Sequence, residues 1–467
     1  MSRSYLQEKL QIPILRFNVR VLQTFGLLLD NSLITNRHGH VLRKGIMYFT
    51  IFIHIQFIFG SVIELFISND ESHQFESLGL ILSYVKGAMQ LYALIFSGKN
   101  FLDLIKSAEV NFSMNGKPLG KTEIPIFDSY VQTANRLARF MWVSFVLTLS
   151  SVFFELVPTF NVSVENHANE FDSQVMGRRN TAYKVWTPFQ KLNNPYLKLD
   201  IIYEMISVTI FFIMFTTINL LTLMLIVFFA GHFNLLAECI ENLTNETGDV
   251  TNTEPIGPKK SKSSLNEEKW ESLDQQRIGV DDLKTPDSVD SKNKDSKRKK
   301  RDKSAESLKF RNEAKLDLRQ YIEHHRKLLK SSEKLNAVLS PIMFMRILSA
   351  VVIFGFDGFY ITRTTDKVML LRYVAGLLYS IMETGLTCWF ASKLSLQSEM
   401  VGEGVYNCRW CSKPISFQRS LRFIIMRAQR PVALSVGPFG TLSMELFARI
   451  LNSAYSYFTV LTQFHEK

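Results

Sequence analysis

Seven apolar stretches recur along the chain, and polar segments separate them. They cover residues 46–66, 78–96, 140–157, 205–229, 339–360, 369–390 and 442–461. Most are close to the roughly 20 residues that a helix needs to cross the hydrocarbon core of a bilayer. A soluble protein rarely needs so many long segments with so few charges. The pattern therefore predicts an all-α polytopic membrane protein with seven transmembrane helices.

The last apolar stretch differs from the others because polar residues recur in it at helical spacing. Intervals of four and three residues separate Glu445, Arg449, Asn452, Ser456, Thr459 and Gln463. At about 100° per residue, these positions fall on one face of a helix. A polar stripe on a membrane helix is expected where helices pack together or where the protein lines water. The pattern alone is compatible with both helix packing and a pore wall.

The loops between the predicted spans alternate in their content of Lys and Arg. The first loop, 68–77, contains neither residue, whereas the N-terminal region and the loops 97–139, 230–338 and 391–441 are all basic. Basic loops favour the cytoplasmic side, so we expect an inverted topology, with a cytoplasmic N-terminus and an extracellular C-terminus. This is the reverse of a G-protein-coupled receptor. The formal net charge of +11 then reflects topology, and we expect no binding of nucleic acid.

A long polar insert interrupts the chain after the fourth apolar stretch. Residues 244–307 are rich in Ser, Lys, Asp and Asn and nearly free of large apolar residues, which predicts disorder. The basic run 297–301 is either solvated or in contact with anionic membrane lipid. Apolar residues return at helical spacing over 308–336 and 407–428, which predicts cytoplasmic helical extensions.

This pattern divides the chain into four regions. They are a cytoplasmic N-terminal region (1–45), four spans that carry an outer ligand pocket (46–243), a disordered basic insert (244–307), and anchor helices with the last three spans (308–467).

Aromatic and soft side chains are frequent in the predicted outer halves of the middle spans. The candidates for ligand binding are Tyr84, Phe153, Phe154, Tyr203, Tyr360, Tyr373, Tyr379 and Met382. Small-molecule pockets are mainly apolar with a few polar anchors, and tyrosine supplies both. Ordinary packing or an aromatic belt at the membrane interface is the alternative for each residue.

Several charged residues fall within or beside the apolar stretches. We expect Lys86 and Glu383 to line a cavity, because they are far from the ends of their spans. Glu155, Glu204 and Arg346 are closer to the ends, where a long side chain can reach the interface.

Motifs of enzymes, metal sites and transporters are not apparent in the sequence. There is no nucleophile–base pattern, no phosphate-binding glycine loop and no internal repeat. Cys408 and Cys411 form a single CxxC, whereas a structural zinc site needs four ligands. We therefore expect neither an enzyme nor a bound metal or cofactor. Asn161 begins a glycosylation sequon that the predicted topology places outside the cell.

Several motifs together are similar to one known family. They are YIEHHRKLL at 321–329, CWF at 388–390, QSE at 397–399, MRAQRPVALSVGPF at 426–439 and MELFARILNSAYSYFTVL at 444–461, with WTP at 186–188 before the fourth span. The chain resembles the insect odorant receptors over most of its length. Its ending, SYFTVLTQF at 456–464, also nearly matches the TYxxxxxQF signature of the related gustatory receptors, with Ser456 in place of the threonine. A gustatory receptor channel is therefore the alternative.

The resemblance implies a subunit of an odorant-gated, non-selective cation channel. Such channels are heterotetramers with a shared co-receptor subunit, located in the plasma membrane of olfactory sensory neuron dendrites. The family picture implies a pocket for a small volatile odorant among the second to sixth helices, and a central pore lined by four copies of the seventh.

Aligned on the C-terminal motif, Val460 and Phe464 match the hydrophobic gate positions, and Gln463 matches the polar position between them. Asn452, Ser456 and Thr459 complete the expected pore face. Phe464 departs from the leucine that is typical of the co-receptor, so we expect a ligand-tuned subunit.

Overall fold

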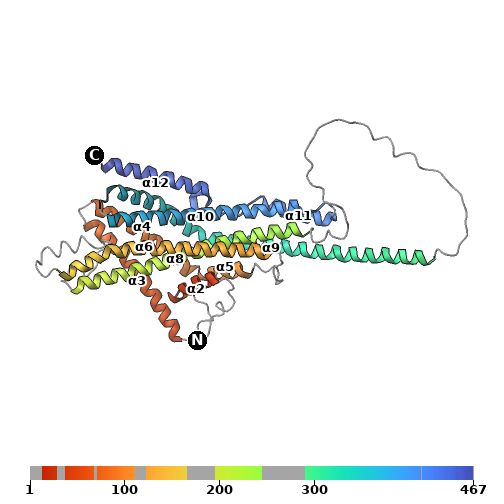
Figure 1. Ribbon diagram of the computed structural model, residues 1–467, viewed down its shortest axis with the longest axis horizontal. Helices are drawn as coiled ribbons and strands as arrows, with labels where there is room; N and C mark the ends of the chain where they lie inside the picture. The colour runs from red at the N-terminus through yellow and green to blue at the C-terminus, as the bar shows by residue number, and fades with distance from the viewer. Residues whose placement is uncertain are drawn as a thin grey trace.

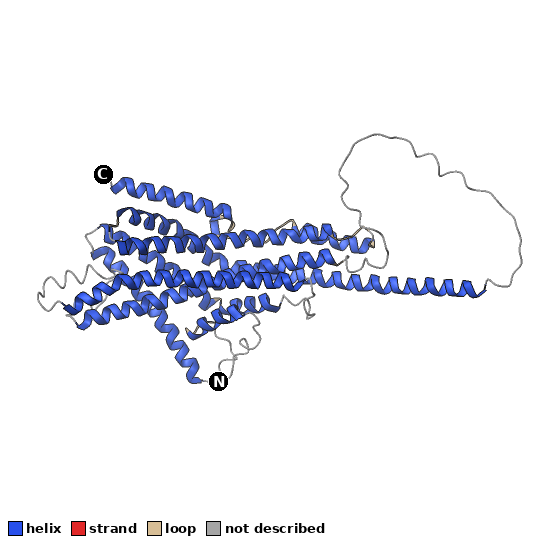
Figure 2. Ribbon diagram, in the orientation of Figure 1, coloured by secondary structure: helices blue, strands red, loops and turns tan. Residues whose placement is uncertain are grey.

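The computed structural model describes residues 13–28, 37–67, 71–110, 123–165, 195–243, 290–365, 367–411 and 413–465. Helices form nearly all of this described part (Figure 2). The helices are α2 (Pro13–Thr24), α3 (Arg37–Ile67), α4 (Glu71–Phe96), α5 (Gly98–Val110), α6 (Glu123–Glu165), α8 (Pro195–Asn242), α9 (Asp290–Arg363), α10 (Lys367–Asn407), α11 (Ile415–Ala428) and α12 (Met444–His465). The predicted all-α fold is confirmed.

Six of the described helices are long and apolar enough to cross a membrane. Their spans are Val41–Ile67, Ser77–Phe96, Glu123–Phe154, Ile201–Asn242, Leu318–Arg363 and Lys367–Asn407. These are the first six predicted spans, so the chain is a multi-pass membrane protein. The seventh predicted span, 442–461, is not among these six. It corresponds to α12, whose 22 residues reach about 33 Å but whose polar stripe makes it less apolar than the six.

Several helices continue far beyond a bilayer. α9 has 74 residues and α8 has 48, whereas about 20 suffice to cross. Figure 1 shows α9 and α10 extending together toward α11. We call the end of the bundle near α11 the anchor end, and the opposite end the cavity end. The prediction that residues 308–336 form a helix leading into the fifth span is confirmed.

Three predicted boundaries are wrong. The insert is not disordered throughout, because α9 already begins at Asp290 and contains the basic run 297–301; Lys, Arg and Glu favour helix, and no Gly or Pro interrupts this segment. Residues 244–289 lie outside the described part. α10 continues to Asn407, so the next helix starts only at Ile415, after Pro414. α6 continues past 157 to Glu165, which places Asn161 in its last turns.

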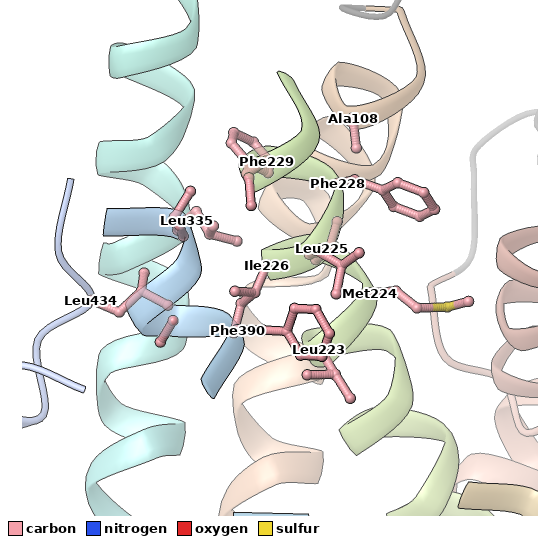
Figure 3. Packing of buried hydrophobic residues seen from close by; sticks show 14 of the residues in the cluster. Ala108, Leu223, Met224, Leu225, Ile226, Phe228, Phe229, Leu335, Phe390 and Leu434 are labelled. Carbon is pink, nitrogen blue, oxygen red and sulfur yellow. The ribbon is translucent and has the colours of Figure 1, made fainter. Parts of the chain in front are cut away.

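α8 is the central helix of the bundle. It packs most extensively against α10 and α6, and 83% of its most apolar window is buried. Figure 3 shows its residues 223–229 pointing in several directions, toward Ala108 of α5, Leu335 of α9 and Phe390 of α10. A helix that is apolar on all sides needs neighbours on all sides, and α8 has them.

A tight turn separates the anchor end from α12. Leu442 N donates to Leu434 O (2.7 Å) and Val436 N donates to Gly440 O (2.8 Å), which closes the chain around a 3₁₀ turn, Gly437–Phe439. Gly437 has a positive φ of 49°, and an added Cβ would lie 2.8 Å from the Phe344 ring. The turn separates the anchor end from α12, which begins at Met444.

Candidate functional site

A cavity of about 180 Å³ lies at the cavity end of the bundle. Its walls come from α4, α6, α8, α9 and α10. The lining residues are Gly79, Leu80, Ser83, Tyr84, Lys86, Thr148, Val152, Phe211, Phe212, Phe215, Ile353, Phe356, Asp357, Tyr360, Arg372, Tyr373, Gly376, Tyr379 and Ser380. These helices are the second to sixth predicted spans, the set that the family resemblance implies for a ligand pocket.

Aromatic rings form much of the cavity wall. The centroids of Tyr84 and Phe211 are 4.3 Å apart, and Phe215 stacks on Phe211 at 5.8 Å. Across the cavity, Tyr360 of α9 and Tyr373 of α10 stack with centroids 4.8 Å apart and nearly parallel planes. Offset and edge contacts of this kind hold rings in fixed positions. The wall is therefore apolar and preformed.

Polar groups lie between the rings and come mainly from α4, α9 and α10. Tyr379 Oη lies 3.3 Å from Thr216 Oγ1, and Arg372 donates to Tyr373 Oη at 3.0 Å. Lys86 Nζ lies 4.4 Å from the centroid of the Phe215 ring. An apolar wall with a few placed polar groups is the usual composition of a small-molecule site.

A buried ionic network lies beside the cavity. Arg346 Nη2 is 2.9 Å from Glu383 Oε1, and Nη1 donates to Thr387 Oγ1 at 2.9 Å. Arg346 also contacts Asn219, whose Oδ1 accepts a hydrogen bond from Gln90 at 3.0 Å. The network joins α4, α8, α9 and α10 at one level of the bundle. A buried charge persists only with such partners.

The expected positions of the charged residues are corrected in part. Arg346 does not reach the membrane interface, because its guanidinium is 1% exposed and paired with Glu383 inside the bundle. Lys86 lines the cavity as expected, whereas Glu383 lies behind it. Glu204 is also buried. The side chain of Glu155 lies outside the described residues.

The structure brings together four of the eight predicted ligand residues. Tyr84, Tyr360, Tyr373 and Tyr379 line the cavity, whereas Phe153, Phe154, Tyr203 and Met382 do not. Phe154 and Met382 are 63% and 44% exposed on the outside of the bundle, and Phe153 is half-buried. Tyr203 donates to Gln56 Oε1 at 2.9 Å instead. Composition identified the right helices, but not the face that each turns inward.

Several lining residues were not among the predicted ligand residues. They include Phe211, Phe212, Phe215, Asp357 and Arg372. The spacing of the lining residues in α10 could have been used to find them. Intervals of four, three and one separate Arg372, Gly376, Tyr379 and Ser380, which places them on one face of the helix. Asp357 is a charged residue within the apolar stretch 339–360, which is a signal that the sequence carries.

α12 has one packed face and one open face. Leu446, Ile450 and Ala454 are buried, and α12 packs mainly against α9. The polar stripe lies on the other side: Glu445, Arg449, Asn452, Ser456 and Gln463 are exposed, and Thr459 is half-buried. Val460 is 45% exposed next to the stripe. Phe464 belongs to the helix, but its side chain lies outside the described residues.

One segment of α9 contacts both the cavity and α12. Phe356 lines the cavity, and its ring meets Tyr457 of α12 edge-on at 5.5 Å. Gly355 lies against the Tyr457 ring, and an added Cβ at Gly358 would lie 3.5 Å from Phe458. The two glycines let the helices approach closely. A change in the cavity wall therefore has a direct path to α12.

The profile of the family described as "7tm Odorant receptor" matches residues 75–455, which is most of the chain. The chain belongs to the odorant receptor family. This family consists of receptors and not of enzymes, and its match favours the odorant branch over the gustatory alternative.

Individual relatives are distant. Odorant receptor 67c of Drosophila melanogaster is 29% identical over 142 residues, which is 30% of this chain and 34% of that protein. Odorant receptor Or2 of Anopheles gambiae is 24% identical over 31% of this chain and 38% of its own length. The Anopheles gambiae odorant receptor coreceptor is 22% identical over 31% of each chain. The matched segment is thus about a third of the length of these relatives.

The fold of this odorant receptor is also found in a solved structure. The insect olfactory receptor OR5 from Machilis hrabei, in complex with eugenol, superposes with a TM-score of 0.69 over 96% of this chain and 97% of that one. Sequence identity is only 14%. The similarity therefore shows a shared fold.

The cysteines of this receptor carry no site. All four are free thiols, and Cys408 of the CxxC is buried. Burial raises the pKa of the Cys408 thiol to about 11, so it stays protonated near neutral pH. Among the described residues, no cluster of His, Cys, Asp and Glu could hold a metal ion.

Proposed function

We propose that this chain is a ligand-tuned subunit of an odorant-gated, non-selective cation channel. It detects a small volatile odorant in sensory perception of smell and assembles with the co-receptor subunit as a heterotetramer. Support comes from family membership and from a ligand-sized cavity coupled to a helix with an open polar face. The OR5 structure holds eugenol, and the same kind of ligand fits a cavity walled by aromatic rings.

The observation that carries this proposal is the two-sided character of α12. Its apolar face is packed on α9, whereas Asn452, Ser456 and Gln463 are exposed. Facing lipid, these side chains would be costly to keep in a membrane. Four subunits that turn this face inward place it against water, which is the arrangement of a pore.

The gate lies near the C-terminal end of α12 in this proposal. Val460 and Phe464 close the pore by dewetting, and Gln463 between them shapes permeation. Asn452, Ser456 and Thr459 line the remaining pore wall. Odorant binding in the cavity favours the open state through the contact of Phe356 with Tyr457, because a ligand shifts an equilibrium only by its difference in affinity between the two states.

The proposed setting follows the inverted topology. The N-terminal region 1–45 and the anchor end, with the start of α9, lie in the cytoplasm. Spans within 46–243 and 308–467 form the pocket and the pore. The C-terminus and Asn161, which is glycosylated, are extracellular. The channel operates in the dendritic plasma membrane of an olfactory sensory neuron.

Electrical recording tests the proposal. We expect volatile-evoked cation currents when the full chain is co-expressed with an insect co-receptor, and the ligand profile should change when another subunit replaces this chain. Gln463→Leu should shift the relative permeability of the channel to Na⁺ and K⁺, because it removes a polar group from the proposed pore near its gate. Silence in every subunit combination, despite surface expression, would contradict the channel. An unchanged reversal potential in Gln463→Leu would contradict the pore face.

A further inference from the structure

Five charged side chains lie in or behind the cavity wall. Three cations, Lys86, Arg346 and Arg372, lie in or behind its wall, with two carboxylates, Asp357 and Glu383. All five side chains come from spanning segments, where an uncompensated charge is costly. Each of these charges is therefore expected to have a partner inside the bundle.

Lys86 has the more distant of two contacts with Glu383. Its ammonium shares Glu383 with Arg346, but the two distances differ: Arg346 is 2.9 Å from one carboxylate oxygen, and Lys86 Nζ is 3.9 Å from the other. Glu383 is thus matched mainly to Arg346.

Lys86 is buried and yet poorly bonded. The residue is 7% exposed, and it belongs to the cavity wall. Among the residues that the structure describes, none forms a hydrogen bond with Nζ. Glu383 Oε2 lies 3.9 Å from Nζ, and the centroid of the Phe215 ring lies 4.4 Å from it. An ammonium has three donors. Those of Lys86 can therefore turn to a molecule in the cavity.

We propose that the cavity binds a small carboxylate with an apolar tail, whose head group accepts hydrogen bonds from Lys86 Nζ. The carboxylate gives the Lys86 ammonium a partner at hydrogen-bonding distance, and charge-assisted hydrogen bonds are the stronger kind. The tail lies among the rings of Phe211 and Phe212 and beside Val152, which offer no polar partner. Short fatty acids have this chemistry and are volatile in their protonated form. The inference rests on the proposed function, because it names the ligand class of the same pocket.

A binding measurement that does not depend on ion flow tests this inference. The full-length chain in lipid nanodiscs is titrated with hexanoate, 1-hexanol and methyl hexanoate, and thermal unfolding is followed by tryptophan fluorescence. The three probes share their apolar part, so their differences report the head group. We expect hexanoate to bind at least about tenfold more tightly than 1-hexanol, since hydrogen bonds to charged groups are the more stabilising ones.

Three variants assign the preference to Lys86. Lys86→Met keeps the length of the side chain but removes the charge, and should bring hexanoate down to the affinity of 1-hexanol. Lys86→Arg should keep most of the preference. Lys393→Met is the matched control, because Lys393 also lies over an aromatic ring, that of Tyr130 at 5.0 Å, but does not line the cavity. It should leave all three affinities unchanged.

The outcomes separate this inference from the proposed channel. Equal or weaker binding of hexanoate than of 1-hexanol by the unaltered chain overturns the inference, whatever the variants do. A hexanoate preference that survives in Lys86→Met also overturns it. Tight, Lys86-dependent hexanoate binding without any current in cells that carry the co-receptor supports the inference and contradicts the channel. Currents that neutral volatiles evoke and hexanoate does not support the channel and contradict the inference.

Discussion

The two ends of the bundle use the same helix in opposite ways. At the anchor end, α8 is surrounded: Leu225, Phe228 and Phe229 are 0% exposed and touch apolar side chains from α5, α9 and α10. At the cavity end, the same helix turns Phe211, Phe212 and Phe215 toward a space that the protein does not fill. A packed interior stabilises the fold, whereas an unfilled one leaves interactions for a ligand to make. The comparison indicates that stability and specificity occupy different halves of one scaffold.

The largest effect is expected between the two ends, at Arg346. Arg346→Met leaves Glu383 buried without its closest partner, and loss of one member of a buried ion pair costs about 3–5 kcal/mol. We expect a strongly lowered unfolding temperature and reduced surface expression. The double variant Arg346→Met with Glu383→Gln should recover part of the stability. A double variant that is less stable than the single one would show that the pair is not the cause.

A pair of phenylalanine substitutions in α8 compares the two ends directly. Phe229→Ala opens a void in the packed anchor end and should lower the free energy of unfolding by about 3 kcal/mol or more. Phe212→Ala only enlarges an existing cavity, so its cost should be clearly smaller, while the affinity for ligands changes. Thermal unfolding and ligand titration of both variants provide the measurement. Equal destabilisation would remove the distinction between the ends.

The contact of α9 with α12 should respond to a single methyl group. Gly355→Ala places a Cβ against the Tyr457 ring, and overpacking of this kind costs about 1–3 kcal/mol. We expect altered spontaneous opening in electrical recordings. Gly45→Ala is the control, because an added Cβ there meets no atom within 4 Å and Gly45 does not line the cavity. If both variants gate normally, α9 does not transmit the ligand signal through this contact.

The smallest effect on stability is expected on the open face of α12. Asn452→Ala and Ser456→Ala alter exposed side chains and should change the unfolding free energy of the isolated subunit by no more than about 0.5 kcal/mol. Ion conduction by the assembled channel should change nonetheless. A large loss of stability before assembly would instead indicate that the polar stripe packs within the subunit.

The sequence predicted the elements better than their faces. Hydropathy located the six apolar spans, because bilayer crossing requires a length that can be counted along the chain. It failed at the start of α9, where helix-forming charged residues resembled a disordered insert. The cavity was predicted on the right helices, yet Phe154 and Met382 point outward. Which side of an apolar helix faces protein and which faces lipid depends on tertiary packing, since both surroundings accept the same side chains.

The partners of the charged residues also could not be predicted from the sequence, because they depend on how the helices pack. Arg346 sits near the end of its predicted span, so its pairing with Glu383, 37 positions along the chain and on another helix, could not be read from spacing. Only the crossing of α9 and α10 brings the two together. The polar stripe of α12 was easier to predict, because all of its members lie on one helix.

The tight turn before α12 fixes the N-terminal end of that helix, so α12 can tilt as a rigid body about this end. Ser435 N donates to Asn336 Oδ1 at 2.7 Å, so the turn is fastened to α9 just before α12 begins. From there α12 extends along one side of the bundle for 22 residues, or about 33 Å, to the C-terminus (Figure 1). A tilt of about 5° about this end moves the C-terminal end of α12 by about 3 Å, close to the diameter of a water molecule. A rearrangement too small to disturb the anchored base is thereby magnified at the tip, where Val460 and Gln463 lie.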